Sequence, residues 1–263
     1  MIPYVTVRFE DRSRGQVAFV AIDNQRKLNS LSSEVMAQFT QALRHLSADP
    51  NLRAVVLSGA GGTAFIGGAS IDEMAEVTSR EAARAFILKV HGCCRAIRDL
   101  SVPVIAAIDG WCLGAGLEVA AACDLRLCSD QARFGMPEVR LGIPSVVEAA
   151  LLPALIGWGR TRRILMTGEI FGANEALAWG FVEEVYLQAM LDTGVNNLLE
   201  QLLEAEPRAV QLQKALIRKW EDLPVTEAIT AGIDAFADAW TTEEPAKAMA
   251  RYLADRAAAK AGR

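Results

Sequence analysis

Two glutamates beside glycine and proline residues are the side chains that this sequence most clearly offers for chemistry. Glu118 follows the glycine turn at residues 114–116 and lies in the first turn of a predicted helix of small apolar residues. Glu138 follows Pro137 in a predicted loop after a short strand, and loops often carry functional side chains. Either carboxyl group is suited to general acid or base catalysis.

Each glutamate also has a structural interpretation. Glu118 could cap its helix or belong to a buried ion pair, because the positive end of the helix dipole tolerates a carboxylate. Glu138 could pair with the nearby Arg140. Other acid–base candidates are few: His45 is predicted to face solvent, His91 lies within a long predicted helix, and no G-x-S-x-G motif occurs. If the chain is an enzyme, carboxylates are therefore its leading acid–base groups.

Two glycine-rich turns, "FIGG" and "LGAG", come directly before predicted helix starts. The second lacks the third glycine of the dinucleotide fingerprint, since that position is Val119, and no phosphate-binding G-x-x-x-x-G-K-[ST] motif occurs. The first N–H groups of a helix have no partner within the helix, so one N–H group from each turn could stabilise an oxyanion. Alternatively, the glycines serve only to make the turns tight.

Composition and charge exclude several classes of protein. Hydrophobic residues make up 52% of the 263 residues and charged residues 22%, which is typical of a globular chain of one or two domains. The net charge of −5 argues against nucleic-acid binding and polybasic membrane docking. We expect no membrane span and no signal peptide, hence a soluble, cytoplasmic protein. The five cysteines lack C-x-x-C spacing, so we expect buried free thiols and neither disulfides nor a metal site.

Hydrophobic periodicity predicts an α/β fold in which helices pack on a sheet. Strands are expected at 4–10, 15–23, 53–61, 102–110, 124–129 and 132–135, and helices at 32–49, 70–77, 79–100 and after the turn at 114–116. Residues 1–195 are predicted to form the α/β core. Residues 196–263 are predicted to be a helical region, with helical stretches at 197–220, 225–240 and 243–262, which packs on another subunit or back on the same chain.

Three stretches together resemble the enoyl-CoA hydratase/isomerase, or crotonase, superfamily. They are "AFIGGASIDEM", "AAIDGWCLGAGLEVAAACDLRLCSDQARFGMPEVRLGIP" and "TGEIFGANEALAWGFVEEV", and their order and spacing are those of the family. The resemblance implies a crotonase-like spiral of ββα units with a helical C-terminal region that forms a homotrimer or a dimer of trimers. It also implies an acyl-CoA thioester as substrate, with no separate cofactor.

By motif position, the resemblance also implies roles for individual residues. The backbone N–H groups of Ala69 and Ala115 would hold the thioester oxygen. Glu118 and Glu138 match the two glutamates that flank the double bond in hydratases, where they add water across the 2,3 bond. Residues expected to border the coenzyme A thioester are Arg26, Lys27, Leu28, Ile66, Gly67, Gly68 and Ile71.

The chain departs from the family pattern at three places. Ser70 stands where the family usually has aspartate, and Ala115 replaces the middle residue of a common G-G-G turn. After "GIP", the segment "SVVEAALLPALIGWGR" replaces a glycine-rich stretch and adds Glu148 and bulk at the pocket wall. This altered wall keeps open another reaction on a CoA thioester, namely double-bond isomerisation, hydrolysis or C–C cleavage. A third hypothesis is an acyl-CoA-binding protein without catalysis.

Overall fold

The computed structural model describes residues 4–261, and strands and helices alternate along the first two thirds of the chain. Six strands form one sheet in the order β1-β2-β3-β5-β7-β10. The β1/β2 pair is antiparallel, and every other neighbouring pair is parallel. The strands are β1 (Val5–Arg12), β2 (Gly15–Ile22), β3 (Leu52–Gly59), β5 (Val104–Ile108), β7 (Leu125–Ser129) and β10 (Glu184–Tyr186).

A second sheet of four short strands has the order β4-β6-β8-β9. Its strands are β4 (Ala64–Ile66), β6 (Trp111–Leu113), β8 (Arg133–Gly135) and β9 (Ile170–Gly172). Three successive segments of the chain each add one strand to the first sheet and the next strand to the second: β3 then β4, β5 then β6, and β7 then β8. This repetition is the spiral of ββα units that the resemblance implies.

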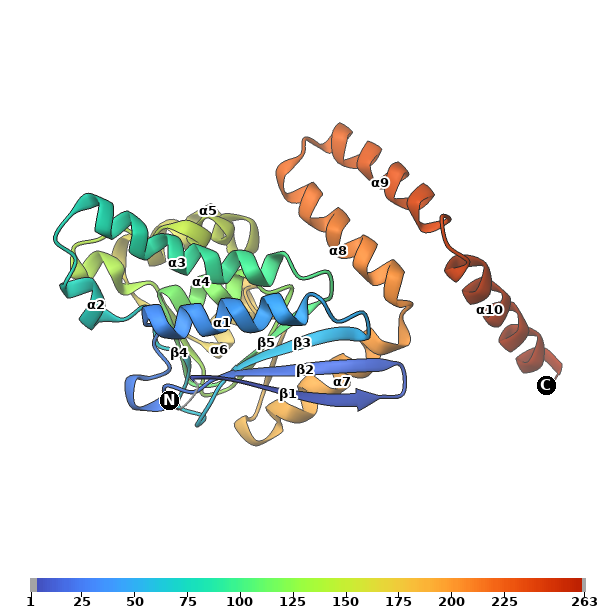
Figure 1. Ribbon diagram of the computed structural model, residues 1–263, viewed down its shortest axis with the longest axis horizontal. Coiled ribbons are helices and arrows are strands. Elements are labelled where there is room, and N and C mark those ends of the chain that lie inside the picture. Colours follow the sequence, from blue (N-terminus) through green and yellow to red (C-terminus); the bar gives the residue numbers. More distant parts are fainter. Residues whose placement is uncertain (1–3, 262–263) are drawn as a thin grey trace. The chain divides into compact units, whose positions relative to one another are not determined.

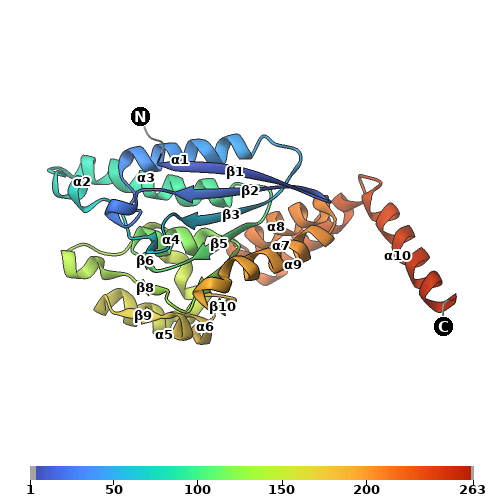
Figure 2. The ribbon, with the colours of Figure 1, turned by 90° about the horizontal axis from the view of Figure 1, so that it is seen from below.

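Helices cover the six-stranded sheet and position the segments between the sheets. Helix α1 (Ser33–Leu46) packs on β1 and β2, and α3 (Arg80–Arg98) lies beside α1 and against α4 (Ala115–Ala122) (Figures 1 and 2). The hydroxyl of Ser32 accepts a hydrogen bond from the Val35 N–H group and so caps α1. The other helices of this part are α2 (Ile71–Ala75), α5 (Leu152–Thr167) and α6 (Ala173–Trp179).

Helix α4 is the element that places a carboxylate inside the protein. All eight of its residues are buried, and seven of them are glycine, alanine, leucine or valine. Its neighbours are α3 and the 3-10 turn Val147–Leu151. Small side chains let these elements approach α4 closely, so its single polar residue, Glu118, lies in the core.

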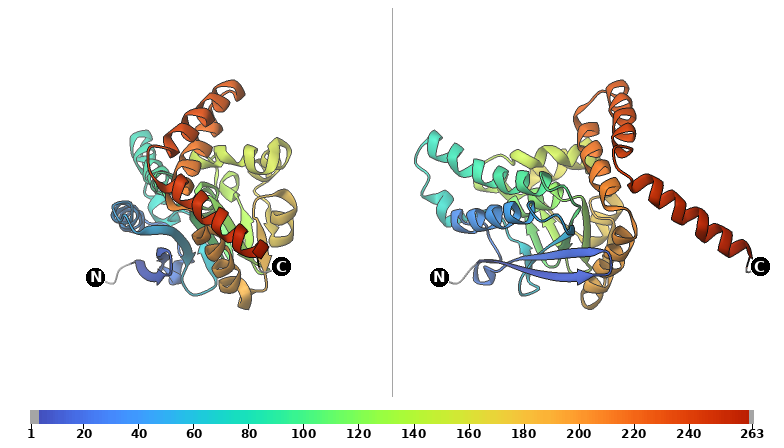
Figure 3. Two further views of the ribbon diagram at one scale, coloured as in Figure 1. Left: turned by 90° about the vertical axis from the view of Figure 1, so that its right-hand side faces the viewer. Right: turned by 45° about the vertical axis from the view of Figure 1, so that its right-hand side comes forward.

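The described chain forms two compact units that divide between Glu200 and Gln201, within α7 (Leu191–Glu204). The second unit is helical, as predicted. Its helices α8 (Pro207–Asp222) and α9 (Val225–Ala239) pack together, and α10 (Glu244–Ala261) extends from the end of α9 (Figure 3).

The predicted stretch 197–220 is two helices, because Pro207 begins a new helix and cannot continue the preceding one. The last predicted helical position, 262, lies outside the described residues. The predicted boundary between residues 195 and 196 stays a prediction.

Across residues 4–261, no helix combines the length and apolar character needed to cross a bilayer. All five cysteines are free and buried.

Candidate active site

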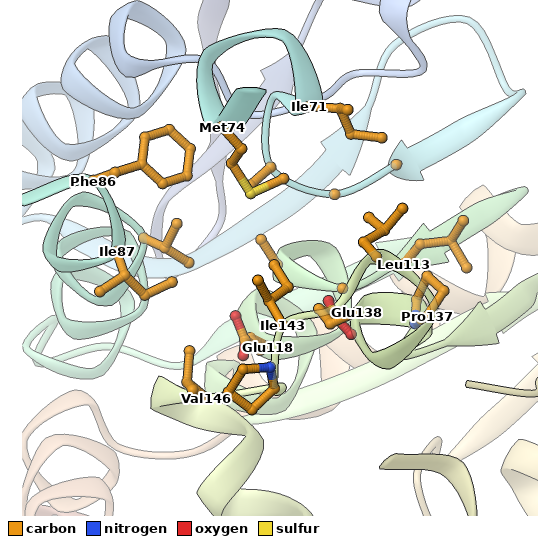
Figure 4. Close-up of a pocket in the computed structure, with 18 residues that line it drawn as sticks. Ile71, Met74, Phe86, Ile87, Leu113, Glu118, Pro137, Glu138, Ile143 and Val146 are labelled. Atoms are coloured by element: carbon orange, nitrogen blue, oxygen red, sulfur yellow. The ribbon is translucent and has the colours of Figure 1, made fainter. Parts of the chain in front are cut away.

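A small and mostly apolar cavity of about 110 Å³ lies between the two glycine turns, α2, α3, α4 and the segment 137–146. Met74, Phe86 and Ile87 form much of one wall, and the carboxyl groups of Glu118 and Glu138 lie on the opposite side (Figure 4). The two glutamates that the sequence singles out are thus brought together, although 20 residues separate them along the chain.

The Glu118 carboxyl group is almost completely enclosed, since only 4% of the residue is exposed. Backbone N–H groups of Val146 and Ala149 donate hydrogen bonds to it. Burial, together with the negative charges of Glu138 and Glu148, nevertheless raises the pKa of Glu118 to about 8. Without substrate, Glu118 is therefore mostly protonated at neutral pH.

Glu138 lies in a 3-10 turn (Pro137–Leu141) and is only partly buried. The hydroxyl of Ser145 donates a hydrogen bond of 2.8 Å to its Oε2 atom. Arg140 instead donates to the carbonyl oxygen of Thr167, at 3.2 Å. An ion pair between Glu138 and Arg140, the structural alternative for this glutamate, is therefore wrong. Its carboxylate stays directed to the cavity.

The two glycine turns lie side by side in the cavity wall. A Cβ atom built on Gly68 would lie 3.4 Å from the carbonyl oxygen of Leu113, in the other turn. Ala69, directly after the first turn, and Ala115, within the second, both line the cavity. Within residues 4–261, neither of their backbone N–H groups has a hydrogen-bond acceptor. Two unoccupied donors next to two carboxyl groups suit a reaction that develops charge on an oxygen atom.

Ser70, which stands where the family usually has aspartate, caps helix α2. Its hydroxyl accepts a hydrogen bond of 3.3 Å from the Glu73 N–H group and so caps α2. Its own N–H group donates to the carbonyl oxygen of Leu31, at 2.9 Å. Serine is a good N-cap residue, as is aspartate, so the departure from the family pattern leaves the local structure intact.

The residues expected to border coenzyme A divide into three groups. Gly67, Gly68 and Ile71 line the cavity, and Leu28 lies next to it, because its carbonyl oxygen accepts a 2.8 Å hydrogen bond from the Gly67 N–H group. Arg26 and Lys27 are exposed and line a separate hollow on the surface, where Lys27 forms an ion pair with Asp72. Ile66 is fully buried in the core and does not line the cavity.

Three residues at the site had no predicted role. Ser145 holds Glu138 through its hydroxyl group. Glu148, which the sequence placed only as an addition to the pocket wall, is 8% exposed. Its Oε1 atom pairs with Nδ1 of His91 at 2.8 Å. Glu148 interrupts an apolar stretch, as Glu118 does, and that was the available signal. Nothing in the sequence indicated Ser145 or His91, because their partners lie on other elements.

Comparisons with known proteins agree with this geometry. Residues 12–260 match the family model described as "Enoyl-CoA hydratase/isomerase". The chain is 33% identical over 243 residues to a short-chain-enoyl-CoA hydratase from Clostridium acetobutylicum, covering 92% of this chain and 93% of that protein. It is 30% identical over 244 residues to a crotonyl-CoA hydratase from Syntrophomonas wolfei, covering 92% and 94%.

Solved structures show the same fold. An enoyl-CoA hydratase from Bacillus anthracis superimposes with a TM-score of 0.89 at 28% identity, covering 96% of each chain. An enoyl-CoA hydratase from Mycobacterium smegmatis gives the same TM-score at 25% identity, covering 95% of this chain and 96% of that one. The predicted crotonase-like α/β fold is confirmed. This chain belongs to the enoyl-CoA hydratase/isomerase family, as an enzyme of the hydratase type.

Proposed function

We propose that the chain adds water across the 2,3 double bond of a short 2-enoyl-CoA ester. The observation that carries this proposal is the meeting of Glu118 and Glu138 in one apolar cavity, with the free N–H groups of Ala69 and Ala115 in its wall. Hydration needs one group to remove a proton from water and one to deliver a proton to Cα. A pair of glutamates that holds one proton between them supplies both.

The reaction would proceed around the thioester oxygen. Hydrogen bonds from Ala69 and Ala115 would polarise the thioester and then carry the negative charge of the enolate that forms when water attacks Cβ. A single donor of this kind is typically worth roughly 2.7–4 kcal/mol of transition-state stabilisation. In the free enzyme the shared proton resides on Glu118, because burial and the charges of Glu138 and Glu148 raise its pKa to about 8.

Cavity size and lining support a short acyl group. The space beside the glutamates is about 110 Å³, and Ile87, Ile143 and Val146 narrow it. The names of the two curated relatives, which specify a short-chain and a crotonyl ester, agree with this size. The rest of the coenzyme would leave the cavity past Leu28 toward Arg26 and Lys27, whose positive charges suit phosphate groups.

Self-association through the helical unit remains part of the proposal, as a homotrimer or a dimer of trimers. Helix α9 and the residue after it carry exposed apolar side chains at helical spacing: Val225, Ile229, Ile233, Phe236 and Trp240. A continuous apolar stripe of this kind is typical of a surface that another subunit covers. The cytoplasmic location also stays a prediction; five free, buried thiols are compatible with a reducing compartment.

The proposed function is tested by identifying products by mass in ¹⁸O-labelled water. We expect a panel of saturated and 2-enoyl-CoA esters to yield a labelled 3-hydroxyacyl-CoA from short enoyl esters only. Glu81→Gln, which changes an exposed carboxylate outside the cavity, is the matched control and should react like the wild type. A shifted double bond, a released acid, or binding without turnover as the dominant result would contradict hydration.

Gly114 offers a second test, because its conformation lets Glu138 approach the cavity. It has φ 52° and ψ −120°, and a Cβ atom there would lie 2.3 Å from Glu138 Oε1. We expect Gly114→Ala to displace that carboxylate and to lower kcat for hydration by about 10²-fold or more, the range for a misplaced acid–base group. Gly159→Ala, where a Cβ atom meets nothing within 4 Å, is the control. Full activity of Gly114→Ala would show that the close approach of Glu138 to residue 114 does not matter for catalysis.

A further inference from the structure

A third carboxylate, Glu148, lies behind the two that face the substrate cavity. It does not line the cavity, and its side chain is only 9% exposed. One oxygen, Oε1, pairs with His91 Nδ1 at 2.8 Å. The other, Oε2, is buried and has no hydrogen-bond partner of good geometry among the described residues, although the Cys94 thiol forms a side-chain hydrogen bond with the carboxyl group. A thiol is a weak donor, and a buried carboxylate oxygen without a strong partner is costly, so a purely structural role explains this residue poorly.

The turn that carries Glu148 also holds Glu118. The N–H groups of Val146 and Ala149, two residues before and one residue after it, donate to the Glu118 carboxyl group. Between them, Val147 has φ 40°, which is strained for a β-branched residue. The backbone therefore takes an unfavourable conformation at the point where one turn both binds Glu118 and places a second carboxylate beside it.

His91 links the buried Glu148 carboxylate to the solvent. Its side chain is 44% exposed and lines a hollow on the side of α3 where Arg44, Arg95 and Asp99 also lie. Arg95 and Asp99 pair with each other at 3.2 Å. The Glu148 carboxylate thus contacts a titratable group that bulk water reaches, while Glu118 itself is enclosed.

We propose that Glu148 and His91 are positioning residues that control how readily Glu118 gives up its proton during hydration. This inference rests on the proposed function of the site. Both act through Glu118 and touch neither substrate nor reacting atoms. The negative charge of Glu148 favours the protonated form of Glu118 by repulsion, and the 2.8 Å contact with His91 Nδ1 holds the Glu148 carboxyl group in place.

The other titratable groups near these residues are few. Glu138 lies on the same side of the cavity as Glu118, and its charge acts in the same direction as that of Glu148. The thiols of Cys93 and Cys94 on α3 also lie near Glu148, and burial raises the pKa of both, for Cys93 to about 12. They stay neutral at physiological pH, and His91 is the residue of α3 that pairs with Glu148 at 2.8 Å.

The test is the pH profile of kcat/KM for hydration, which reports groups of the free enzyme. The active pair holds one proton, so activity falls at alkaline pH as Glu118 loses it. Glu148→Gln keeps the shape of the side chain but removes its charge, and we expect the alkaline limb to move about one pH unit lower. His91→Gln keeps the charge of Glu148 but removes the imidazole that holds it in place, so it should move the limb less than Glu148→Gln does. In the double variant, His91→Gln should have no further effect.

Matched controls are Glu81→Gln on the exposed surface of α3 and His45→Gln, which changes the other histidine, on α1. Neither should move the limb. An alkaline limb that stays within about 0.2 pH unit of the wild type in Glu148→Gln would overturn the proposal, as would a larger shift in His91→Gln than in Glu148→Gln. Because His91 is half-exposed, its variant should fold even if Glu148→Gln does not.

A second readout separates failure of this inference from failure of the proposed function. If no enoyl-CoA ester is hydrated, the proposed function fails, but the proton on Glu118 is still measurable from the pH dependence of the unfolding equilibrium. Glu148→Gln should move the upper end of that dependence to lower pH by the same amount as the kinetic limb. An unchanged dependence contradicts the coupling whatever the enzyme catalyses.

Discussion

Glu118→Gln and Glu138→Gln are each expected to lower kcat for hydration by about 10²- to 10⁴-fold, the usual contribution of a positioned acid or base. Glutamine keeps the size and polarity of the side chain but neither accepts nor releases a proton near neutral pH. KM should change much less, because the apolar wall and the N–H groups of Ala69 and Ala115 remain. Steady-state kinetics on the best enoyl-CoA ester measures both quantities.

The double variant distinguishes a working pair from two independent groups. If the two glutamates act on one water and one enolate, removing the second should cost far less than removing the first, since residues that act as a unit are not additive. Glu81→Gln serves as the control for a lost surface carboxylate. A single variant that retains a tenth or more of the wild-type kcat would remove that glutamate from the proposed mechanism.

Glu118 should also make the protein less stable as the pH rises. Its pKa is raised in the folded protein from 4.5 to about 8, mainly by burial, so between those values the native state holds a proton that the unfolded chain releases. The contribution to stability is therefore full below about pH 4.5 and is lost as the pH rises toward 8. We expect Glu118→Gln to abolish this loss and to gain up to about 5 kcal/mol over the wild type at pH 9.

Urea unfolding at pH 5 and pH 9 measures this difference directly. At pH 5 the two proteins should have nearly the same free energy of unfolding, because Glu118 is then protonated and resembles glutamine. Subtracting the variant's change in unfolding free energy between pH 5 and pH 9 from that of the wild type cancels the other titrating groups, which the two proteins share. Equal stability of variant and wild type at pH 9 would mean that the native protein relaxes to hydrate Glu118. An active-site residue that costs stability in this way is common among enzymes.

Most of the fold followed from local patterns. The strands β3 and β5 were predictable because a strand buried on both faces is a short continuous apolar run, and β1 because polar and apolar residues alternate along it. The predicted helix at 32–49 begins at its Ser32 cap, whereas the predicted stretch 197–220 is divided where Pro207 begins α8. Helix α5 and the short elements β9, α6 and β10 had no prediction, because three-residue strands and a helix with Gly157 in a non-helical conformation leave little periodicity to detect.

The candidate site was likewise predictable only in part. By themselves, the residue types identified Glu118, Glu138 and the two glycine turns, since a carboxylate among small apolar residues and a glycine before a helix are visible without coordinates. Their meeting in one cavity depended on the two sheets and the spiral between them. The partners that set their behaviour were out of reach of the sequence: Ser145 on Glu138, Val146 and Ala149 on Glu118, and His91 on Glu148.

The sequence by itself therefore determined which groups are available for catalysis and which backbone turns accompany them. Only the tertiary structure decided how they behave. The pKa of Glu118 depends on exclusion of water and on charges 20 and 30 residues further along the chain, and both arise when α3, α4 and the 146–149 turn pack together. Desolvation and charge repulsion act through space, so no local pattern of residues records them.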